Sequence, residues 1–385
     1  MAVCIFFKNQ HIMRIGILTL PLHTNYGGIL QAYALQTVLE RMGHEVEVFD
    51  KPDQIHRPLW RNSMTFAKRL ALRAIGKSVS LNYQKEHNIR ERTKRKYVNV
   101  FIQQHIKRRE LKSYGAISPT DYDAIVVGSD QVWRQKYMPK MNVKIPYLAF
   151  TEGWNIKRIA YAASFGSDEW EYTDKNTTAA KLAIQRFDAV STRERSGVKL
   201  CKDYLDYNDA VQVLDPTLLL DRKDYVHIIE ESELTHEING NLMCYVLDYT
   251  NEKRQYISEC AKVLDMIPFE TNSKYEVKGA SLDEIVQPPV EQWLRSFRDS
   301  SFVITDSFHA CVFSILFHKP FVVIGNQSRG LARFASLLSL FGLEDSMVTE
   351  NLDVSLCDRP IDWDRVDIQL KKLRADSKSY LEQVL

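Results

Sequence analysis

The segment 306–309, read as DSFH, brings a carboxylate, a hydroxyl and an imidazole into one short turn. A β-branched apolar run precedes it and apolar residues at helical spacing follow it, which predicts a buried strand, a turn and a helix. Ser307 and His309 would then lie beside unpaired backbone N–H groups at a helix N-terminus, where anions bind. The alternative is structural: Asp306 or Ser307 caps the helix and His309 is a satisfied polar residue.

Further apolar runs also end in polar residues. The side chains expected at these strand ends are Ser129 and Asp130 after 124–127, Ser164 at the end of 158–165, Arg193 after 189–192, and Asp215 after 211–214. Because parallel strands bring their carboxyl ends to one edge of a sheet, where ligands bind in open α/β folds, these groups should meet. Polar side chains at corresponding ends of four consecutive strands are hard to explain by packing alone.

The first strand–turn–helix unit carries two glycines, Gly27 and Gly28, at its turn. Its elements are a strand at 14–20, a helix at 29–42 and a second strand at 45–50. Glycines at such a turn let a ligand approach the backbone N–H groups, although a tight turn with packing glycines would look the same. The spacing is not G-x-G-x-x-G, so nothing favours a dinucleotide.

The alternation of strands and helices along 385 residues predicts an α/β protein with more than one domain. A polar, turn-rich stretch at 231–241 is the expected linker. We therefore expect a Rossmann-like domain at 1–235 and a second at 241–355, and in 356–385 a helix long enough to return to the first domain.

Positive charge is concentrated in one part of the chain. The net charge is only +2, but 57–112 holds 16 Lys and Arg against three Glu. This basic helical insert, 54–112, includes a stretch from 64 to 79 that places Phe66 and Leu70 on one side and basic residues around the rest. It predicts a basic amphipathic helix that contacts a membrane surface or a phosphate-bearing acceptor, or is simply a solvated face. We expect no nucleic-acid partner.

The cysteines and the N-terminus bear on the compartment. Six cysteines lie without a C-x-x-C or Cys/His pairing, which indicates reduced thiols of a cytoplasmic protein and no metal site. The apolar part of residues 1–13 is too short for a signal peptide, and translation could start at Met1 or Met13. No apolar stretch is long enough to span a membrane.

Taken in order, seven motifs resemble the polysaccharide pyruvyl transferase family: LHTNYGGILQAYAL, DYDAIVVGSDQVW, AYAASFG, VSTRERSGV, VLDPTLL, ITDSFHA and KPFVVIGNQ. The resemblance extends over roughly 14–341, most of the chain. It implies two Rossmann-like domains facing across a cleft (GT-B-like), with a C-terminal helix crossing back. It also implies transfer of the pyruvyl group of phosphoenolpyruvate onto two hydroxyls of a sugar, giving a pyruvate ketal in exopolysaccharide, capsule or cell-wall polymers, without a cofactor.

The resemblance also implies roles for individual residues. Arg193, Ser307 and His309 would bind phosphoenolpyruvate, and His309 would be the general acid or would protonate the phosphate. Asp130 or Asp306 would accept the hydroxyl proton, unless either one only holds a loop or caps a helix. Some relatives have a basic residue where Ser307 stands, so the group that neutralises the phosphate is left open.

The acceptor sugar, lipid-linked or free, would face the first-domain loops, where Tyr26 and Trp133 could stack on a pyranose ring. The other acceptor residues would be Asn25, Gly27, Gly28, Gln31, Ser129, Gln131, Asn326 and Arg329. Such a protein would be cytoplasmic, at the inner face of the membrane if the basic segment binds lipid. The alternatives are a nucleotide-sugar-dependent glycosyltransferase of the same fold and an inactive glycan-binding relative.

Overall fold

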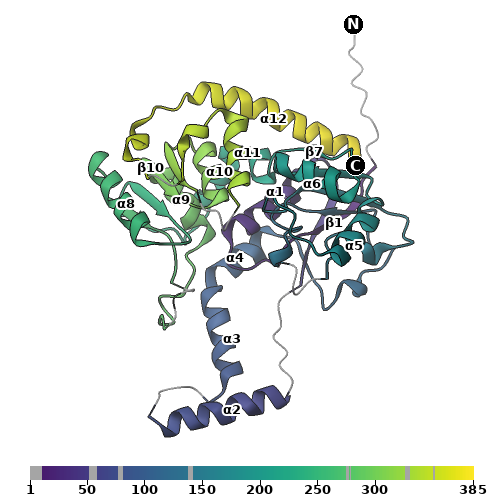
Figure 1. The fold of residues 1–385 in the computed structure, drawn as a ribbon, viewed down its shortest axis with the longest axis horizontal. Helices are drawn as coiled ribbons and strands as arrows, with labels where there is room; N and C mark the ends of the chain where they lie inside the picture. The colour runs from purple at the N-terminus through teal and green to yellow at the C-terminus, as the bar shows by residue number, and fades with distance from the viewer. Residues whose placement is uncertain are drawn as a thin grey trace.

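A computed structural model describes residues 11–51, 59–76, 81–137, 142–274, 277, 279–325, 330–349 and 352–385. Over these residues the chain forms two parallel β-sheets, each covered by helices. A long helix, α12 (Trp363–Val384), runs along the outside from the second domain to the first (Figure 1). The expected α/β class with two Rossmann-like domains is confirmed.

The first sheet has the order β3-β2-β1-β4-β5-β6-β7, and all of its neighbouring strands are parallel. The strands are β1 (Arg14–Leu18), β2 (Glu45–Asp50), β3 (Arg108–Glu110), β4 (Ala124–Val127), β5 (Lys157–Ala163), β6 (Ala189–Thr192) and β7 (Val211–Gln212). The chain direction across the sheet reverses between β1 and β4, and ligands bind outside the carboxyl ends of strands at such a point. The loops 21–25 and 128–133 follow those two strands.

Helices α1 (Tyr26–Arg41), α5 (Asp174–Ile184) and α6 (Arg195–Leu205) belong to the body of this domain. Helix α7 (Arg222–Glu230) packs mainly against α9 (Val290–Asp299) of the second domain. Helix α1 is buried over most of its surface because it lies between the first sheet and α10 of the second domain. It starts at Tyr26, three residues before the expected start, so both Gly27 and Gly28 belong to its first turn.

The second sheet has the order β12-β11-β10-β8-β9, again parallel throughout. Its strands are β8 (Leu242–Tyr245), β9 (Pro268–Glu270), β10 (Phe302–Thr305), β11 (Phe321–Ile324) and β12 (Met347–Val348). Its helices are α8 (Asn251–Val263), α9 (Val290–Asp299), α10 (Phe308–Leu316) and α11 (Leu331–Phe341). The strand–turn–helix–strand expected around DSFH is therefore confirmed as β10, α10 and β11.

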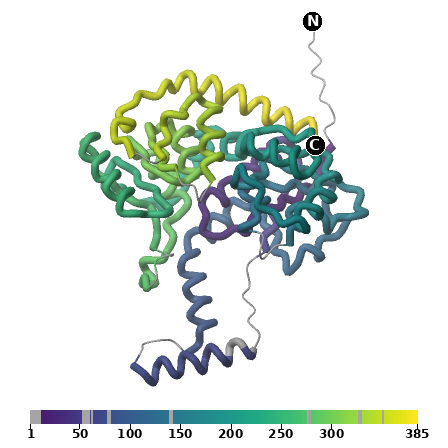
Figure 2. Tube along the Cα trace, viewed as in Figure 1, coloured from purple at the N-terminus to yellow at the C-terminus, as the bar shows by residue number. Residues whose placement is uncertain are grey.

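Helix α12 (Trp363–Val384) joins the two domains. Near its start Asp367 lies 2.8 Å from His318 of the second domain. Farther along, Ser377 accepts a hydrogen bond from the backbone N–H of Leu214, 3.1 Å away, in the first domain. The expected return of the C-terminal helix is thus confirmed (Figure 2).

The basic segment folds into helices rather than one irregular stretch. They are α2 (Leu59–Ala74), α3 (Tyr83–Lys94) and α4 (Lys96–His105). Helix α4 is anchored by buried Val98, Phe101 and Ile102, whereas α3 buries no side chain. Helices α2 and α3, which we call the arm, extend away from the body (Figure 1). The 3₁₀ turns of the described connections are Tyr114–Ala116, Gln135–Tyr137, Ala149–Thr151, Pro216–Leu219, Glu344–Ser346 and Val354–Asp358.

Candidate active site

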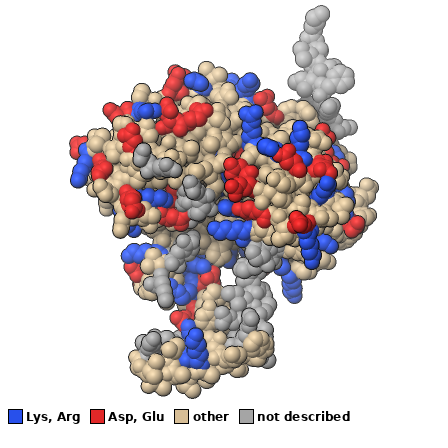
Figure 3. Space-filling model, in the orientation of Figure 1, with Lys and Arg blue, Asp and Glu red and all other residues tan. Residues whose placement is uncertain are grey.

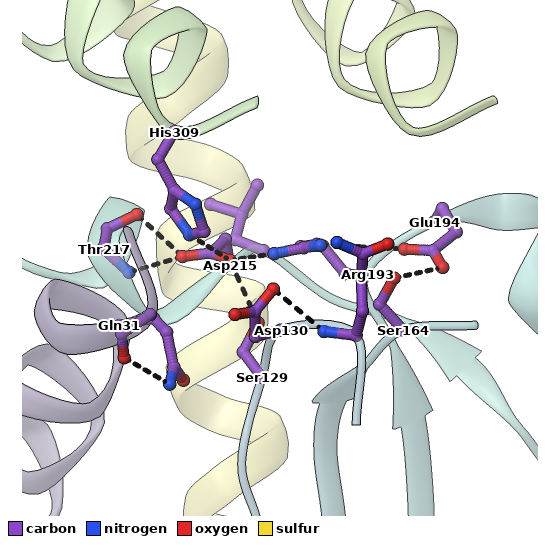
Figure 4. A network of polar contacts seen from close by, with 12 residues as sticks. Gln31, Ser129, Asp130, Ser164, Arg193, Glu194, Asp215, Thr217 and His309 are labelled. Carbon is purple, nitrogen blue, oxygen red and sulfur yellow. Dashed lines mark hydrogen bonds and ion pairs between the residues drawn. The ribbon is translucent and has the colours of Figure 1, made fainter. Parts of the chain in front are cut away.

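Asp215 is the centre of a buried polar cluster between the two domains. Its Oδ1 accepts hydrogen bonds from the backbone N–H and the hydroxyl of Thr217, at 3.0 and 2.7 Å. Its Oδ2 accepts one from Ser129 Oγ and one from Arg193 Nη1, each at 2.9 Å, and lies 3.5 Å from His309 Nε2. The ends of β4, β6 and β7 and the start of α10 therefore meet at one carboxylate, as Figure 4 shows.

The charges around Asp215 fix its ionisation state. Burial alone raises the pKa of this carboxyl, but the charges and hydrogen bonds of His309 and Arg193 outweigh burial and hold the pKa well below its ordinary value. Asp215 is therefore an anion that holds the Arg193 guanidinium and the His309 imidazole, which come from different domains, in place. Sequence analysis placed Asp215 at a strand end but gave it no role.

Arg193 has one side of its guanidinium hydrogen-bonded and the other side buried without a hydrogen-bond partner among the described residues. Nη1 binds Asp215, whereas Nε and Nη2 are buried and have no hydrogen-bond partner among the described residues. Glu194 Oε2 lies 3.8 Å from Nε, too far for a hydrogen bond, and the guanidinium stacks on the Phe308 ring with 4.1 Å to the ring centroid. Because buried unsatisfied donors are costly, the Nε–Nη2 edge indicates a site for a two-oxygen anion.

Glu194 serves to order the neighbouring strand end. Its Oε1 accepts hydrogen bonds from Ser164 Oγ at 2.7 Å and from the backbone N–H of Phe165 at 3.1 Å. The carboxylate thus connects the end of β5 to the end of β6. It also supplies negative charge beside Arg193, which makes a buried guanidinium tolerable.

His309 is held from the opposite domain by a glycine. A Cβ on Gly27 would lie 1.9 Å from His309 Nδ1, so the imidazole packs directly on the first turn of α1. Gly28, the next residue, would place a Cβ no closer than 3.3 Å to any atom. Gly27 is therefore required for close approach of the two domains at His309, and the predicted glycine turn has a packing role here.

Arg333, which sequence analysis missed, lies on α11 beside this cluster. Its side chain is buried, and its guanidinium carbon is 5.7 Å from the centroid of Phe308, the ring on which Arg193 also stacks. Burial first, and then the charge of Arg193, lower the pKa of Arg333 to about 10. In the sequence it appears as one basic residue in an amphipathic helix, and only the packing of α11 shows that it faces the cluster.

Asp130 has a strained backbone. Its φ is +74°, in the left-handed region that residues other than glycine rarely occupy. One carboxylate oxygen accepts a hydrogen bond from the backbone N–H of Gln131 at 2.9 Å, and the other accepts one from Asn25 Nδ2 at 3.4 Å. Burial and the charge of Arg193 lower the pKa of Arg333, and the negative charge of Asp130 opposes that lowering.

The two residues before Phe308 have different roles. Ser307 is at the N-cap position of α10, but its side chain makes no capping hydrogen bond and is half-buried. Asp306 is fully buried and accepts from the backbone N–H of Leu247 at 2.7 Å and from Lys253 Nζ at 2.6 Å. The expectation that Asp306 accepts a substrate proton is therefore wrong, because both of its oxygens stabilise the β8–α8 connection.

The expectation of aromatic stacking on a sugar is also wrong. Tyr26 is fully buried, stacks on Trp293 with 5.1 Å between centroids, and donates its hydroxyl to the Pro288 carbonyl at 2.7 Å. Trp133 is fully buried and stacks on Tyr147 at 5.0 Å. Both rings pack inside the protein because large aromatic side chains gain most from burial.

The remaining acceptor residues divide into three groups. Gln31 and Ser129 are fully buried, and Gln31 donates to Thr19 Oγ1 and to the Gly28 carbonyl, at 2.9 and 2.8 Å. Asn25 is exposed, and Gly28 and Gln131 are partly exposed. Asn326 and Arg329 lie outside the described residues.

Two general features of the described residues also bear on function. They contain no group of three or more His, Cys, Asp or Glu side chains placed to hold a metal ion. Among the helices described, none has both the length and the apolar character needed to cross a membrane.

Solved structures show a similar overall fold. An Arabidopsis thaliana protein, UGT89C1, complexed with UDP-L-rhamnose has 11% sequence identity and a TM-score of 0.50, with 96% of this chain and 94% of that one covered. UDP-GlcNAc 2-epimerase from Neisseria meningitidis, bound to UDP-GlcNAc, has 8% identity and a TM-score of 0.50, with 97% of this chain and 99% of that one covered. At these identities the likeness shows a GT-B-like fold and nothing more.

Sequence comparison is more informative about the family. No curated protein matches the sequence at a significant level. The model of the polysaccharide pyruvyl transferase family matches residues 25–328, which include the glycine turn, Asp130, Arg193, Asp215 and His309. The chain belongs to the polysaccharide pyruvyl transferase family.

Proposed function

We propose that this protein transfers the pyruvyl group of phosphoenolpyruvate to two hydroxyls of a sugar, forming a pyruvate ketal on a polysaccharide or its precursor. The observation that supports this most is the unsatisfied Nε–Nη2 edge of Arg193, buried beside Arg333 and His309 where the two domains meet. A small ligand with two anionic groups matches two guanidinium groups and an imidazole gathered in one place.

Donor binding would use both arginines. The Arg193 edge would take two oxygens of the phosphate or the carboxylate, and Arg333 would face the other anionic group. In this arrangement Arg333 supplies the positive charge that some relatives have at the position of Ser307. Ser307 would instead offer its uncapped hydroxyl, together with the N-terminal N–H groups of α10. The like charge of Arg193, which lowers the pKa of Arg333, would be compensated when the anion binds.

The reaction would need one acid and one base. Protonation of the methylene carbon gives a cationic centre at C2, which a first sugar hydroxyl attacks. The bond from C2 to the phosphate oxygen then breaks, and a second hydroxyl closes the ketal ring. Of the two hydroxyl protons, one replaces the proton used to form the methyl group and the other leaves with phosphate. His309, oriented by Asp215, would be the acid, and Asp130 the base.

The acceptor would approach from the first domain. Asn25, Gly28 and Gln131 surround Asp130 and retain exposed surface. A sugar placed there would bring its hydroxyls to Asp130 and its donor-facing side to Arg193. No step in this scheme requires a metal ion or an organic cofactor, so we expect turnover in the presence of a chelator.

The decisive experiment incubates the protein with phosphoenolpyruvate and candidate oligosaccharides, free and lipid-linked. Mass spectrometry should detect a pyruvate ketal on the acceptor, and one phosphate should be released per ketal. His309→Ala should abolish both signals, whereas His227→Ala, at an exposed histidine on α7, should leave them unchanged. Phosphate release without acceptor modification would contradict the proposal.

Ligand binding distinguishes the proposed pyruvyl transfer from the two alternative functions of a protein with this fold. Phosphoenolpyruvate should raise the unfolding temperature of the protein, and UDP-sugars should not. Stabilisation by UDP-sugars alone would favour a nucleotide-sugar-dependent glycosyltransferase. Stabilisation by free oligosaccharide alone, without turnover, would favour a glycan-binding protein.

A further inference from the structure

The arm presents its apolar side to solvent. Met64, Phe66, Leu70 and Ile75 on or directly after α2 are 66%, 48%, 52% and 69% exposed. At 100° per residue these side chains, with Trp60, lie within one half of the helix surface. Exposure of five large apolar side chains on or directly after one helix is unusual for a water-soluble surface, and such patches mark interaction sites.

Helix α2 is attached to the protein through its polar side. Arg69 binds Glu86 of α3 at 2.6 Å and lies over the ring of Tyr83, with 4.9 Å to its centroid. Amphipathic helices of globular proteins pack the other way, with the apolar stripe inward. Because α3 holds the polar side of α2, the apolar stripe is turned outward, away from α3.

Charge on α2 indicates what the stripe would contact. The helix sequence LWRNSMTFAKRLALRA contains no acidic residue, and Lys68 and Arg73 are exposed at opposite borders of the apolar stripe. In Figure 3 the end of the arm is mostly uncharged surface with basic side chains beside it. Two copies pairing through these stripes would bring their basic borders together, which is unfavourable. An anionic surface would attract the borders and bury the stripe.

We propose that α2 docks the protein on the surface of a bilayer that contains anionic lipids. The helix would lie in the plane of the headgroups, with Phe66 and Leu70 inserted and Lys68 and Arg73 against lipid phosphates. With 16 residues and four basic side chains it lies on the membrane and does not cross it.

The base of the arm connects this surface to the candidate active site. Glu91 of α3 lies 3.2 Å from His23, and Arg95 donates to the carbonyl of Leu22 at 2.7 Å. Both partners belong to the loop that leads into Asn25 and α1. An arm seated on a bilayer would therefore hold the acceptor-side loop near the membrane, where a lipid-linked sugar would be presented.

Vesicle binding tests the proposal on the full chain. Flotation should recover the protein with vesicles of phosphatidylethanolamine and phosphatidylglycerol, and much less with phosphatidylcholine alone. Phe66→Asp with Leu70→Asp should weaken binding about tenfold or more. Lys68→Gln should weaken it by about fivefold, with the loss reproduced by raised salt. The matched control is Leu182→Asp on α5, an apolar residue that is 70% exposed, and it should bind as the unmodified protein does.

Three outcomes would overturn the proposal. They are equal binding by the Phe66/Leu70 variant and the unmodified protein, equal binding to neutral and anionic vesicles, and a dimer in vesicle-free solution that the Phe66/Leu70 variant abolishes. The last would make α2 an interface between copies of the chain. Vesicle binding is independent of turnover, so its failure would leave the proposed reaction with soluble acceptors untouched.

Discussion

The interdomain polar cluster and the arm depart in opposite ways from the usual distribution of side chains in a soluble protein. At the cluster, Arg193, Asp215 and Arg333 are charged groups that are more than nine-tenths buried. On the arm, Phe66 and Leu70 are apolar groups that are about half exposed. Each arrangement is costly by itself, since buried charge loses hydration and exposed apolar surface orders water.

The two regions therefore need binding partners of different kinds. Buried donors such as Arg193 Nε and Nη2 are satisfied by a small anion that fits between the domains. An apolar stripe with basic borders is satisfied by an extended anionic surface. Changes in the cluster should therefore alter turnover, whereas changes on the arm should alter the location of the protein alone.

The largest effect is expected at Arg193. Arg193→Lys keeps a positive charge but loses the two-nitrogen edge, and we expect kcat/KM for phosphoenolpyruvate to fall roughly a thousandfold, equivalent to about 4 kcal/mol. Arg41→Lys is the matched control, because Arg41 also pairs with a carboxylate, Asp224 at 2.9 Å, but on the exposed surface. If Arg193→Lys kept more than about a tenth of the activity, the Arg193 guanidinium would not be required for binding phosphoenolpyruvate.

Asp215 tests whether the cluster also stabilises the fold. Its pKa is depressed in the folded protein, so its contribution is present above the unfolded-state value near pH 4 and is lost as the pH falls below it. Asp215→Asn should lower stability by about 3 kcal/mol at pH 7. In this variant the free energy of unfolding should also decrease less steeply as the pH falls below about 4. Urea unfolding at a series of pH values measures both, and an unchanged acid limb would show that Asp215 is not the titrating group.

Substitutions of Arg333 test whether this residue binds phosphoenolpyruvate or only stabilises the fold. Arg333→Gln should raise the KM for phosphoenolpyruvate about a hundredfold, with a smaller change in kcat, because a charged contact to bound donor is lost. Its unfolding temperature without ligand should change little, because the substitution removes both the attraction of Arg333 to Glu194 and Asp130 and its repulsion by Arg193. Arg333→Lys should restore part of the affinity. A large loss of stability with unchanged KM would assign Arg333 to the fold.

The contact between the domains can be tested with neighbouring glycines. Gly27→Ala should displace His309 and lower kcat roughly thirtyfold, because its Cβ would overlap the imidazole. Gly28→Ala introduces the same methyl group where the nearest atom is 3.3 Å away, and its effect should be about threefold at most. Equal effects of the two variants would mean that the position of the imidazole does not limit the reaction.

The smallest effect is expected from the arm. Phe66→Asp with Leu70→Asp should change the free energy of unfolding by less than about 0.5 kcal/mol, because neither side chain is buried. Turnover with a soluble acceptor should also stay the same. A marked drop in the urea midpoint would show that the apolar stripe of α2 packs against the rest of the protein. The arm would then not differ from the cluster in the way described above.

Much of the site could be predicted from strand ends. Apolar runs identified β4, β6 and β7, and parallel pairing requires their carboxyl ends to lie at one edge, so the meeting of Ser129, Arg193 and Asp215 followed from the order of residues. The resemblance in motif order likewise led to the family, which the family model confirms. Periodicity failed where side-chain direction mattered: Tyr26 and Trp133 follow the same loops but point into the core.

The sequence by itself determined the α/β class, the two sheets and the groups at their strand ends, because these depend on hydrophobic periodicity and on pairing between neighbouring segments. Tertiary structure alone decided that His309 packs on Gly27, that Arg333 joins Arg193 at Phe308, and that α2 turns its apolar side outward. Each of these depends on how elements distant in the chain, or the two faces of one helix, are oriented. Local residue patterns determine which face of a helix or strand is apolar, but they do not determine which neighbouring element packs on that face.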